Sequence, residues 1–362
     1  MESILASTED HLVSNLQFKI PSKSGASYVQ SKSQVTFFPQ GGNIYSPTTV
    51  ARIIWFALAS DGYLDLSSLA VSMDLAVGPI GAATPLVAGG HSLFSRLRWT
   101  MSGTTVEDIE YFNTCSEMFH RLLPQEARQN IELMAFGGTA IPPGHTKSIV
   151  MMPKVSGLCN QPLWVAAGFL GSQGACVEFH LQDGDEIFQS GAGQNITYQL
   201  SNCRVLCDVY HISNELANTY ASHVLSGKPL VYPIKSLVNT QFQLQSGTPS
   251  FDLNIARGFS RLNSVFLVMH GATSATVRDV NTFIGMNPEA VNGRLQIGSK
   301  QWPDGQNVQG MCQWWYRLIS ALGVVHSASH NIAITRTEYE TNSFICAWDT
   351  EKVPVATGTG YN

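Results

Sequence analysis

Charged residues are scarce in this 362-residue chain. Lys, Arg, Asp and Glu make up only 13% of its residues, about half of the ~25% that is usual for soluble domains. A protein of this size normally keeps a charged surface, so the shortage indicates that neighbouring subunits cover part of it. The 21 basic and 26 acidic residues give a net charge of -5 and are spread without blocks. This argues against a nucleic-acid binder with a basic arm, because phosphate neutralisation needs clustered Lys and Arg.

Long hydrophobic runs are also missing. The longest apolar stretch, residues 53–59, is far shorter than the ~20 residues that a membrane helix needs. The start, Met1-Glu2-Ser3-Ile4, has neither a basic nor an apolar region, so we expect no signal peptide. The cysteines number seven, an odd count, and are scattered along the chain. We therefore expect reduced and mostly buried thiols rather than a disulfide framework.

Short alternating segments are what the sequence does contain. Val177, Phe179 and Leu181 alternate with Glu178 and His180, and a period of two with one apolar face predicts a half-buried strand. Further strands are expected at 34–38, 50–58, 69–76, 95–101, 148–155, 203–209, 229–233, 251–255, 264–270, 293–297 and 344–348. The 31 Gly and 16 Pro supply the turns. This pattern predicts an all-β fold of sandwiches or barrels.

A few helices interrupt the strands. Apolar residues at helical spacing predict helices at 112–122, 214–225 and 311–322, and a weaker pattern covers 7–16. The first of them stops before Pro124, and the third is followed by Gly323, which are common helix ends. We expect their apolar stripes to pack in the core.

A short repeat suggests two related halves. Phe94-Ser95-Arg96-Leu97 recurs at residues 259–262, and each copy is soon followed by Met-x-Gly-x-Thr, at Met101 and Met269. Two β domains of ordinary size would fit the length. The polar, glycine-rich segment 182–195 is the expected boundary. We therefore divide the chain into 1–190, a first domain with the N-terminal segment, and 191–362, a second domain.

Catalytic motifs are not found. There is no Walker loop, and Gly191-Ala192-Gly193 lacks the third glycine of a dinucleotide fingerprint. Ser172 lies in Gly171-Ser172-Gln173-Gly174, but Leu170 occupies the position of the first glycine of a nucleophile elbow. We therefore read Ser172 as a loop serine and do not expect an enzyme.

Metal and cofactor sites are weakly indicated at best. Cys203 and Cys207 would point to one face of a strand about 13 Å apart, too far to bridge or share a zinc ion. We read them as core thiols. His326 and His330 have the spacing of a helical metal pair, but their segment is Ser-rich and has no acidic or thiol partner nearby. We expect no metal and no cofactor.

A carbohydrate-active protein remains an alternative. Its carboxylates would come from the acidic residues of two segments, and its sugar platform from an aromatic cluster. These residues are Asp183, Asp185, Glu186, Glu338 and Glu340, and Trp302, Trp314, Trp315 and Tyr316. A retaining glycosidase needs two carboxyl groups about 5 Å apart, which a sequence cannot place. Solvated loop charges are the simpler interpretation of the acids. For the aromatic cluster, core packing is favoured over a subunit interface or a ligand face.

The whole-chain pattern resembles the double jelly-roll major capsid proteins of icosahedral DNA viruses, the lineage of adenovirus, nucleocytoplasmic large DNA virus and polinton-like capsids. The likeness covers most of residues 30–355. Segments 151–154, 162–163 and 175–181 look like the closing strands of a first jelly roll. Segment 198–210 with the helix 214–225 looks like the opening of a second. The similarity also includes 252–257, 261–262, 296–300 and 349–352.

The resemblance implies two tandem eight-stranded jelly rolls with a few short helices in the connections. It implies a homotrimer of six barrels that forms a pseudo-hexameric capsomer and tiles an icosahedral shell, with the protein located in the virion. Neighbouring trimers, penton and minor capsid proteins and an internal membrane are the implied partners, without sequence-specific nucleic-acid binding.

Two alternatives stay open beside the capsid hypothesis. One is the tandem β-sandwich carbohydrate-binding protein or glycosidase. The other is a single-jelly-roll capsid protein with a protruding domain. The latter usually carries a basic N-terminal arm, whereas the first 50 residues here hold only Lys19, Lys23 and Lys32 as basic residues.

Overall fold

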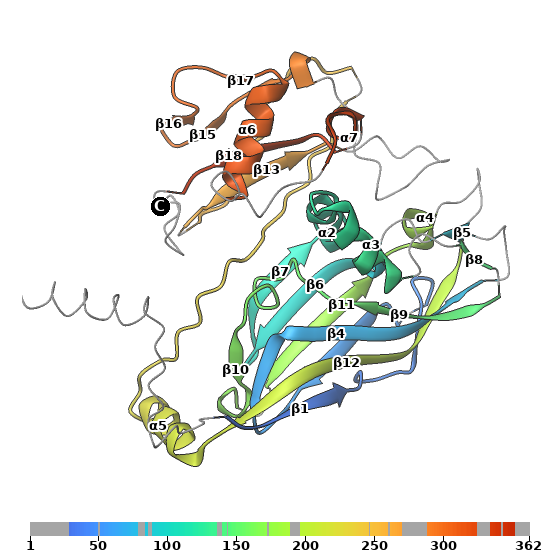
Figure 1. The fold of residues 1–362 in the computed structure, drawn as a ribbon, viewed down its shortest axis with the longest axis vertical. Coiled ribbons are helices and arrows are strands. Elements are labelled where there is room, and N and C mark those ends of the chain that lie inside the picture. Colours follow the sequence, from blue (N-terminus) through green and yellow to red (C-terminus); the bar gives the residue numbers. More distant parts are fainter. Residues whose placement is uncertain are drawn as a thin grey trace, which may run out of the picture.

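The computed structural model describes residues 29–49, 51–78, 84–85, 89–135, 140–142, 144–171, 174–188, 196–245, 247–259, 261–269, 288–323, 334–341 and 343–351. A β-sandwich occupies the first part of the chain, and a smaller set of helices and strands follows it (Figure 1). The helix expected at 7–16 lies outside the described residues.

Two antiparallel sheets build the sandwich. The six-stranded sheet runs β1 (Val29–Phe37), β12 (Tyr198–Ile212), β4 (Tyr63–Val77) and β10 (Trp164–Ala166), with β2 (Ile44–Tyr45) on β12 and β9 (Thr146–Met151) on β4. The four-stranded sheet runs β3 (Ile53–Leu58), β11 (Ala175–Leu181), β6 (Phe94–Met101) and β7 (Thr104–Glu110).

The order of these strands is that of a jelly roll. The eight principal strands in chain order are β1, β3, β4, β6, β7, β9, β11 and β12. Numbered one to eight, they pair as 1-8-3-6 in one sheet and 2-7-4-5 in the other. Successive strands thus change sheets in the nested Greek-key manner of a jelly roll. The predicted all-β fold class is confirmed.

Strand β12 corrects the expected layout. Segment 198–210 was expected to open a second jelly roll, and this prediction is wrong. The strand pairs with β1 along one edge, where Val35 faces Cys207, and with β4 along the other, where Val71 faces Val205. Because both edges are taken by strands of the first half, the first jelly roll extends to Ile212, beyond the expected boundary at 182–195.

The core lies between the two sheets and follows the predicted alternation. In β11, Val177, Phe179 and Leu181 point inward and are buried, while Glu178 and His180 point outward. The ring of Phe179 meets that of Phe94 at 5.0 Å and that of Phe56 at 6.3 Å between centroids. These three rings belong to the four-stranded sheet, and Leu200 and Val205 of the six-stranded sheet are buried in the same cluster. Both sheets therefore contribute apolar side chains to one core, which the structure of a β-sandwich requires.

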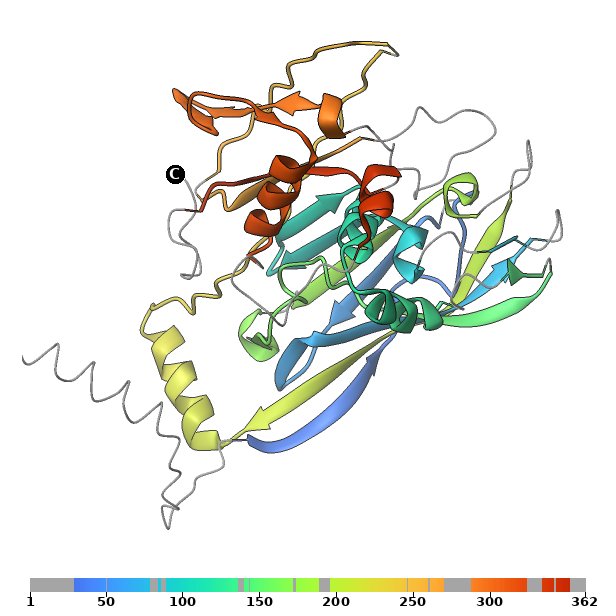
Figure 2. The same cartoon turned by 45° about the horizontal axis from the view of Figure 1, so that its top comes forward.

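The three stronger helix predictions are confirmed. They correspond to α2 (Phe112–Arg121), α5 (Asn214–Leu225) and α6 (Met311–Ala321). The remaining helical elements are η1 (Gly90–Leu93), α3 (Gln125–Leu133), η3 (Ala167–Phe169), α4 (Gly184–Ile187), η4 (Pro288–Ala290) and α7 (Arg336–Thr341). Helices α2 and α3 lie at the end of the sandwich that faces the second half (Figure 2).

The second half contains short antiparallel pairs. They are β13 (Ser264–Val268) with β18 (Ile345–Asp349), β14 (Asn292–Gly293) with β17 (Val308–Gln309), and β15 (Leu295–Ile297) with β16 (Lys300–Trp302). A further pair, β5 (Thr84–Pro85) with β8 (Ala140–Ile141), belongs to the first half. Within its described residues the second half shows no complete eight-stranded sandwich, so a second jelly roll stays a prediction.

The sequence repeat does not mark equivalent strands. Its first copy begins β6, where Phe94 and Leu97 are buried. In the second copy, Phe259 and Arg261 are exposed and precede β13 without belonging to a named strand. The four-residue match is therefore no evidence for duplicated jelly rolls.

We predict that Phe179→Ala destabilises the jelly roll by about 3–5 kcal/mol, because it leaves a cavity between the two sheets. Urea unfolding followed by tryptophan fluorescence measures this change. Phe38→Ala is the matched control: its side chain is 68% exposed, so a change within about 0.5 kcal/mol is expected. Equal destabilisation by both substitutions would contradict the placement of this core.

Candidate functional site: the junction between the two halves

The cysteines proposed as core thiols are indeed in the core. Cys203 and Cys207 are buried on the inner face of β12, and both are free thiols. Burial raises the pKa of each thiol to about 12. Both side chains therefore stay protonated at neutral pH, which makes them poor nucleophiles and poor metal ligands.

The other predicted ligands and acids do not converge. His326, His330 and Ser172 lie outside the described residues, as do the side chains of Asp185 and Glu186. Asp183 pairs with Arg52 at 2.8 Å on the surface. In α7, Glu340 accepts a hydrogen bond from Arg336 at 2.7 Å, and Glu338 accepts one from the backbone N–H of Thr335 at 2.8 Å. The described acids thus have separate local partners instead of sharing a cleft.

The three tryptophans of the aromatic cluster belong to the core of the second half, whereas Tyr316 is exposed and outside it. Trp314 is fully buried, packs edge-on against Trp348 at 5.4 Å, and donates its indole N–H to the carbonyl of Val291 at 3.0 Å. Trp315 packs edge-on against Tyr339 at 5.0 Å. Core packing, the favoured interpretation, is confirmed for Trp314, which leaves no flat face for a sugar ring.

Helix α2 joins the two halves through apolar contacts. Its residues Met118 and Leu122 are buried in the same cluster as Trp314. Phe119 packs edge-on against Phe266 of β13, with 5.6 Å between ring centroids. One face of a first-half helix thereby completes the core of the second half.

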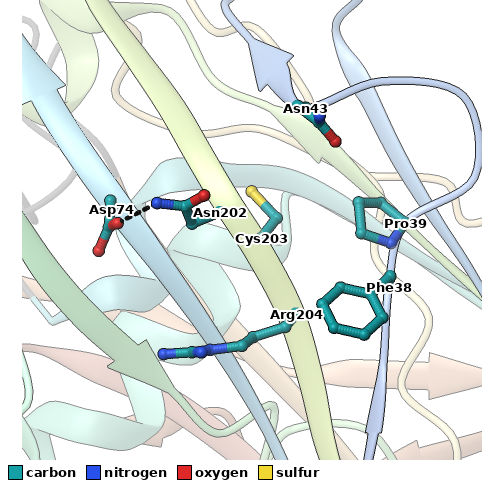
Figure 3. A pocket seen from close by; sticks show the side chains of 7 residues that line it. All are labelled: Phe38, Pro39, Asn43, Asp74, Asn202, Cys203 and Arg204. Carbon is teal, nitrogen blue, oxygen red and sulfur yellow. Dashed lines mark hydrogen bonds between the residues drawn. The ribbon is translucent and has the colours of Figure 1, made fainter.

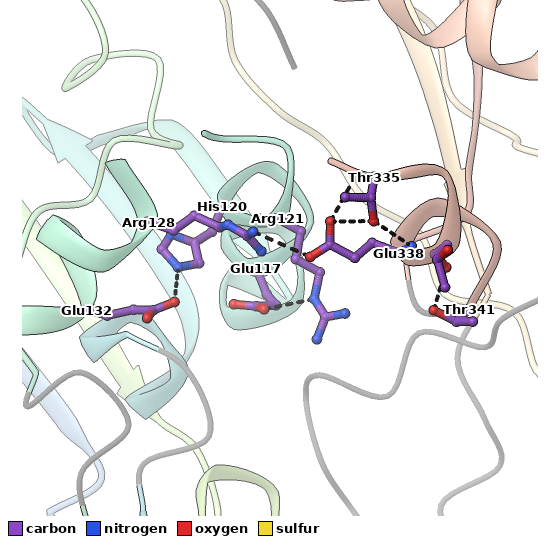
Figure 4. A network of polar contacts seen from close by, with 9 residues as sticks. Glu117, His120, Arg121, Arg128, Glu132, Thr335, Glu338 and Thr341 are labelled. Atoms are coloured by element: carbon purple, nitrogen blue, oxygen red, sulfur yellow. Dashed lines mark hydrogen bonds and ion pairs between the residues drawn. The ribbon is translucent and has the colours of Figure 1, made fainter. Parts of the chain in front are cut away.

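The other face of α2 carries a buried polar network (Figure 4). Glu117 lies 3.0 Å from His91 Nε2 and accepts a hydrogen bond from Arg121 Nε at 2.9 Å. His120 Nε2 lies 3.0 Å from Glu132 of α3, and the rings of His91 and His120 are 5.4 Å apart. These charge-assisted contacts fix α2 against η1 and α3.

The charge of Glu117 is stabilised by its partners. Burial alone would raise the pKa of this carboxyl, but the hydrogen bond from His91 and the charges of His91, Arg121 and His120 outweigh it. The pKa of Glu117 is therefore lowered. The side chain is ionised at neutral pH and lies between His91 and Arg121.

One ion pair crosses from the first half to the second. Arg128 of α3 lies 3.7 Å from Glu338 of α7 (Figure 4). Hydrogen bonds from Thr335, the charge of Arg128 and its hydrogen bond lower the pKa of Glu338. Because both side chains are partly exposed, the pair contributes little free energy and serves mainly to orient α7 above α3.

A charged ladder covers the outer face of the four-stranded sheet. Trp55, Glu178, Arg98 and Asp108 form one cross-strand row. The next row contains Arg96, which makes a bidentate contact with Asp108 at 2.7 and 2.6 Å. This contact lowers the pKa of Asp108 and raises that of Arg96. In a chain so poor in charge, the ladder is a distinctive surface.

A shallow pocket lies at the end of β1 (Figure 3). Its volume is about 290 Å³, and it is lined by Phe38, Pro39, Asn43, Asp74, Asn202, Cys203 and Arg204. Asn202 donates a hydrogen bond to Asp74 at 2.7 Å, and Arg204 donates one to Ser72 at 3.5 Å. These local bonds use the polar groups that a ligand would need.

The described residues contain neither a metal-binding cluster nor a membrane-spanning helix. No group of three or more His, Cys, Asp or Glu side chains there could hold a metal ion. No helix in that part of the chain is both long and apolar enough to span a bilayer.

Comparison with solved structures identifies the fold. A chain of the PBCV-1 virus capsid is similar over 94% of this chain and 82% of its own length, with a TM-score of 0.57 and 13% identity. The chain has a viral capsid-protein fold. The crystal structure of PBCV-1 VP54, fitted into a reconstruction of the virophage Sputnik, is similar over 94% of this chain and 82% of its own length. Its TM-score is 0.56 and its sequence identity is 11%. The match to the Faustovirus major capsid protein covers 59% of each chain, with a TM-score of 0.40 and 10% sequence identity.

At the level of sequence, no family model and no curated protein matches the chain. The expected resemblance to viral capsid proteins is therefore confirmed as a likeness of fold, and the count of two jelly rolls stays a prediction. The observed strand order of residues 29–212 agrees with this likeness of fold.

We predict that Glu117→Gln lowers the free energy of unfolding at pH 7 by about 1.5–3 kcal/mol, because it removes charge-assisted hydrogen bonds to His91 and Arg121. Because the pKa of Glu117 is lowered in the folded protein, its ionised side chain stabilises the fold at pH values above 4.5, the ordinary glutamate pKa. This contribution is lost as the pH falls below 4.5. The difference from the wild type should therefore shrink towards pH 3 in urea titrations. A difference that stays constant from pH 7 to 3 would contradict this role.

Proposed function

We propose that this chain is a major capsid protein that trimerises into pseudo-hexameric capsomers and tiles an icosahedral viral shell. The observation that carries the proposal is the fold shared with the PBCV-1 capsid chain over 94% of this sequence. Two jelly rolls in each of three chains would give six barrels and a nearly hexagonal outline, which can fill the faces of an icosahedron.

The surface composition supports an assembly role. With 13% charged residues, much of the exterior is uncharged, and such a surface loses little desolvation energy when subunits cover it. Contacts between capsomers would be individually weak but numerous, so that misplaced units can leave during growth of the shell. The charged ladder with the exposed edge of Trp55 is one surface suited to such contacts, since Trp and Arg are favoured in interfaces.

The partners follow from the same proposal. Neighbouring trimers, penton proteins and minor capsid proteins would contact the rim of each capsomer, and an internal membrane could lie beneath the shell. The protein would be assembled inside the host cell and reside in the virion, without sequence-specific contact to the genome. The work is done by burial of surface rather than by bond chemistry, so we propose no enzymatic activity.

We expect the purified protein to form trimers or larger particles. Three chains of 39.4 kDa would give about 118 kDa by size exclusion with light scattering. A stable monomer at all concentrations would contradict the proposal. Glycan-array binding by such a monomer, lost on Trp315→Ala, would instead support the carbohydrate-binding alternative.

A further inference from the structure

The connection between the two halves lies against the jelly roll over residues 232–239, here called the strap. The strap is extended and alternates in burial: Tyr232, Ile234, Leu237 and Asn239 are half-buried, whereas Val238 is exposed. Before it, Tyr220 of α5 meets Tyr63 of β4 with 6.4 Å between ring centroids. Most residues of 240–259 are exposed. The strap is therefore the part of the connection after α5 that docks on the jelly roll.

The carboxylate of Glu107 is buried beneath the strap. Glu107 of β7 is only 2% exposed. It accepts hydrogen bonds from the hydroxyl of Ser156 at 2.5 Å and from the N–H of Gly157 at 2.9 Å. Burial raises the pKa of this carboxyl, and Leu158 and Ser236 are close enough to oppose that rise together with Ser156 and Gly157. One side chain thus binds the loop 156–158 to β7 and lies beside Ser236 of the strap.

The backbone of the strap lies against a glycine. A Cβ added at Gly157 would overlap the carbonyl oxygen of Lys235. A larger residue would force the strap away from the loop, although the backbone of Gly157 itself needs no left-handed conformation. The close approach therefore accounts for a glycine at position 157.

Contacts at both ends extend this docking site. Gln161 donates a hydrogen bond to the carbonyl of Pro233 at 2.7 Å, and Asn239 donates one to the carbonyl of Glu110. Lys235 lies 3.5 Å from Glu351, the second residue after β18. The strap thereby contacts the jelly roll along its length and the chain just beyond β18 through Lys235.

Docking is separable from folding of the jelly roll. The core between the two sheets is made by residues of 37–209, and only Ile234 and Leu237 of the strap pack against its margin. Such marginal contacts open at lower free energy than the core. The strap can therefore leave the jelly roll without unfolding it.

We propose that Glu107, Ser156, Gly157 and Gln161 form a docking site for the chain's own residues 232–239, and that this docking fixes the second half relative to the jelly roll. The use we assign to it rests on the proposed capsid function, since a pseudo-hexameric capsomer needs a fixed angle between the barrels of each chain. The docking itself does not depend on assembly.

Trypsin digestion of the full-length native protein tests the docking. The bond after Lys235 lies inside the strap, although the Lys235 side chain is 62% exposed. The bond after Arg257 lies in the exposed segment and serves as an internal reference. In the wild type we expect cleavage after Arg257 to be at least about tenfold faster, because proteolysis follows the population of the open form.

Two alanine variants then separate docking from chain flexibility. Gly157→Ala should speed cleavage after Lys235 about tenfold and leave cleavage after Arg257 unchanged. Gly168→Ala is the matched control, because a Cβ there meets only the carbonyl oxygen of Asp61, at 4.0 Å, and it should match the wild type at both bonds. Near-UV circular dichroism of each variant checks that the jelly roll is intact.

Ser236→Ala covers the case in which Gly157→Ala does not fold. It removes a hydroxyl beside Glu107 and should raise the hydrogen exchange of residues 232–239, which is the readout for this variant because Ser236 is part of the bond that trypsin cleaves. Rapid cleavage after Lys235 in the wild type, or unchanged cleavage in Gly157→Ala together with unchanged hydrogen exchange in Ser236→Ala, would overturn the docking site. Either result is independent of oligomer mass, so it is distinguishable from a failure of the capsid proposal.

Discussion

The position of β12 between β1 and β4 is the constraint on which the rest of the structure depends. This strand is the last of the jelly roll, yet it inserts between the first and third strands of the six-stranded sheet. Its inner face carries Val205, Cys207 and Val209, which are all buried in the common core. Closure of the sandwich therefore requires β1 to pair with a strand about 170 positions later in the chain, and such non-local pairing is slow to form.

Closure of the jelly roll creates the surfaces that hold the second half. Helix α2 follows β7 and offers Phe119 and its apolar neighbours to β13, while its polar face is fixed by Glu117 and His91. In the middle of β7, Glu107 binds the loop 156–158 and lies beside Ser236 of the strap. The junction thus depends on two buried glutamates that a closed sandwich keeps from water.

Local patterns predicted many of the elements but not their partners. The strands expected at 229–233 and 251–255 are wrong, because the structure has no strand there, and α5 buries none of its residues although its apolar stripe was expected in the core. Alternation in 175–181 and helical spacing in 112–122 gave β11 and α2 because they depend on neighbouring residues alone. The same alternation marked 203–209 as a strand but could not tell which sheet it joins, since the period is identical in either sheet. The resemblance to capsid proteins was correct for the fold but misassigned this strand. The polar junction was missed because Glu117 and His91 are 26 residues apart and neither stands in a recognisable motif.

Cryo-electron microscopy of the purified protein tests the central claim most directly. The account predicts particles with threefold symmetry and six barrels, three of which fit the jelly roll of residues 29–212 as described here. Particles with a single barrel per chain, or monomers with the second half folded as a separate non-barrel domain, would contradict it.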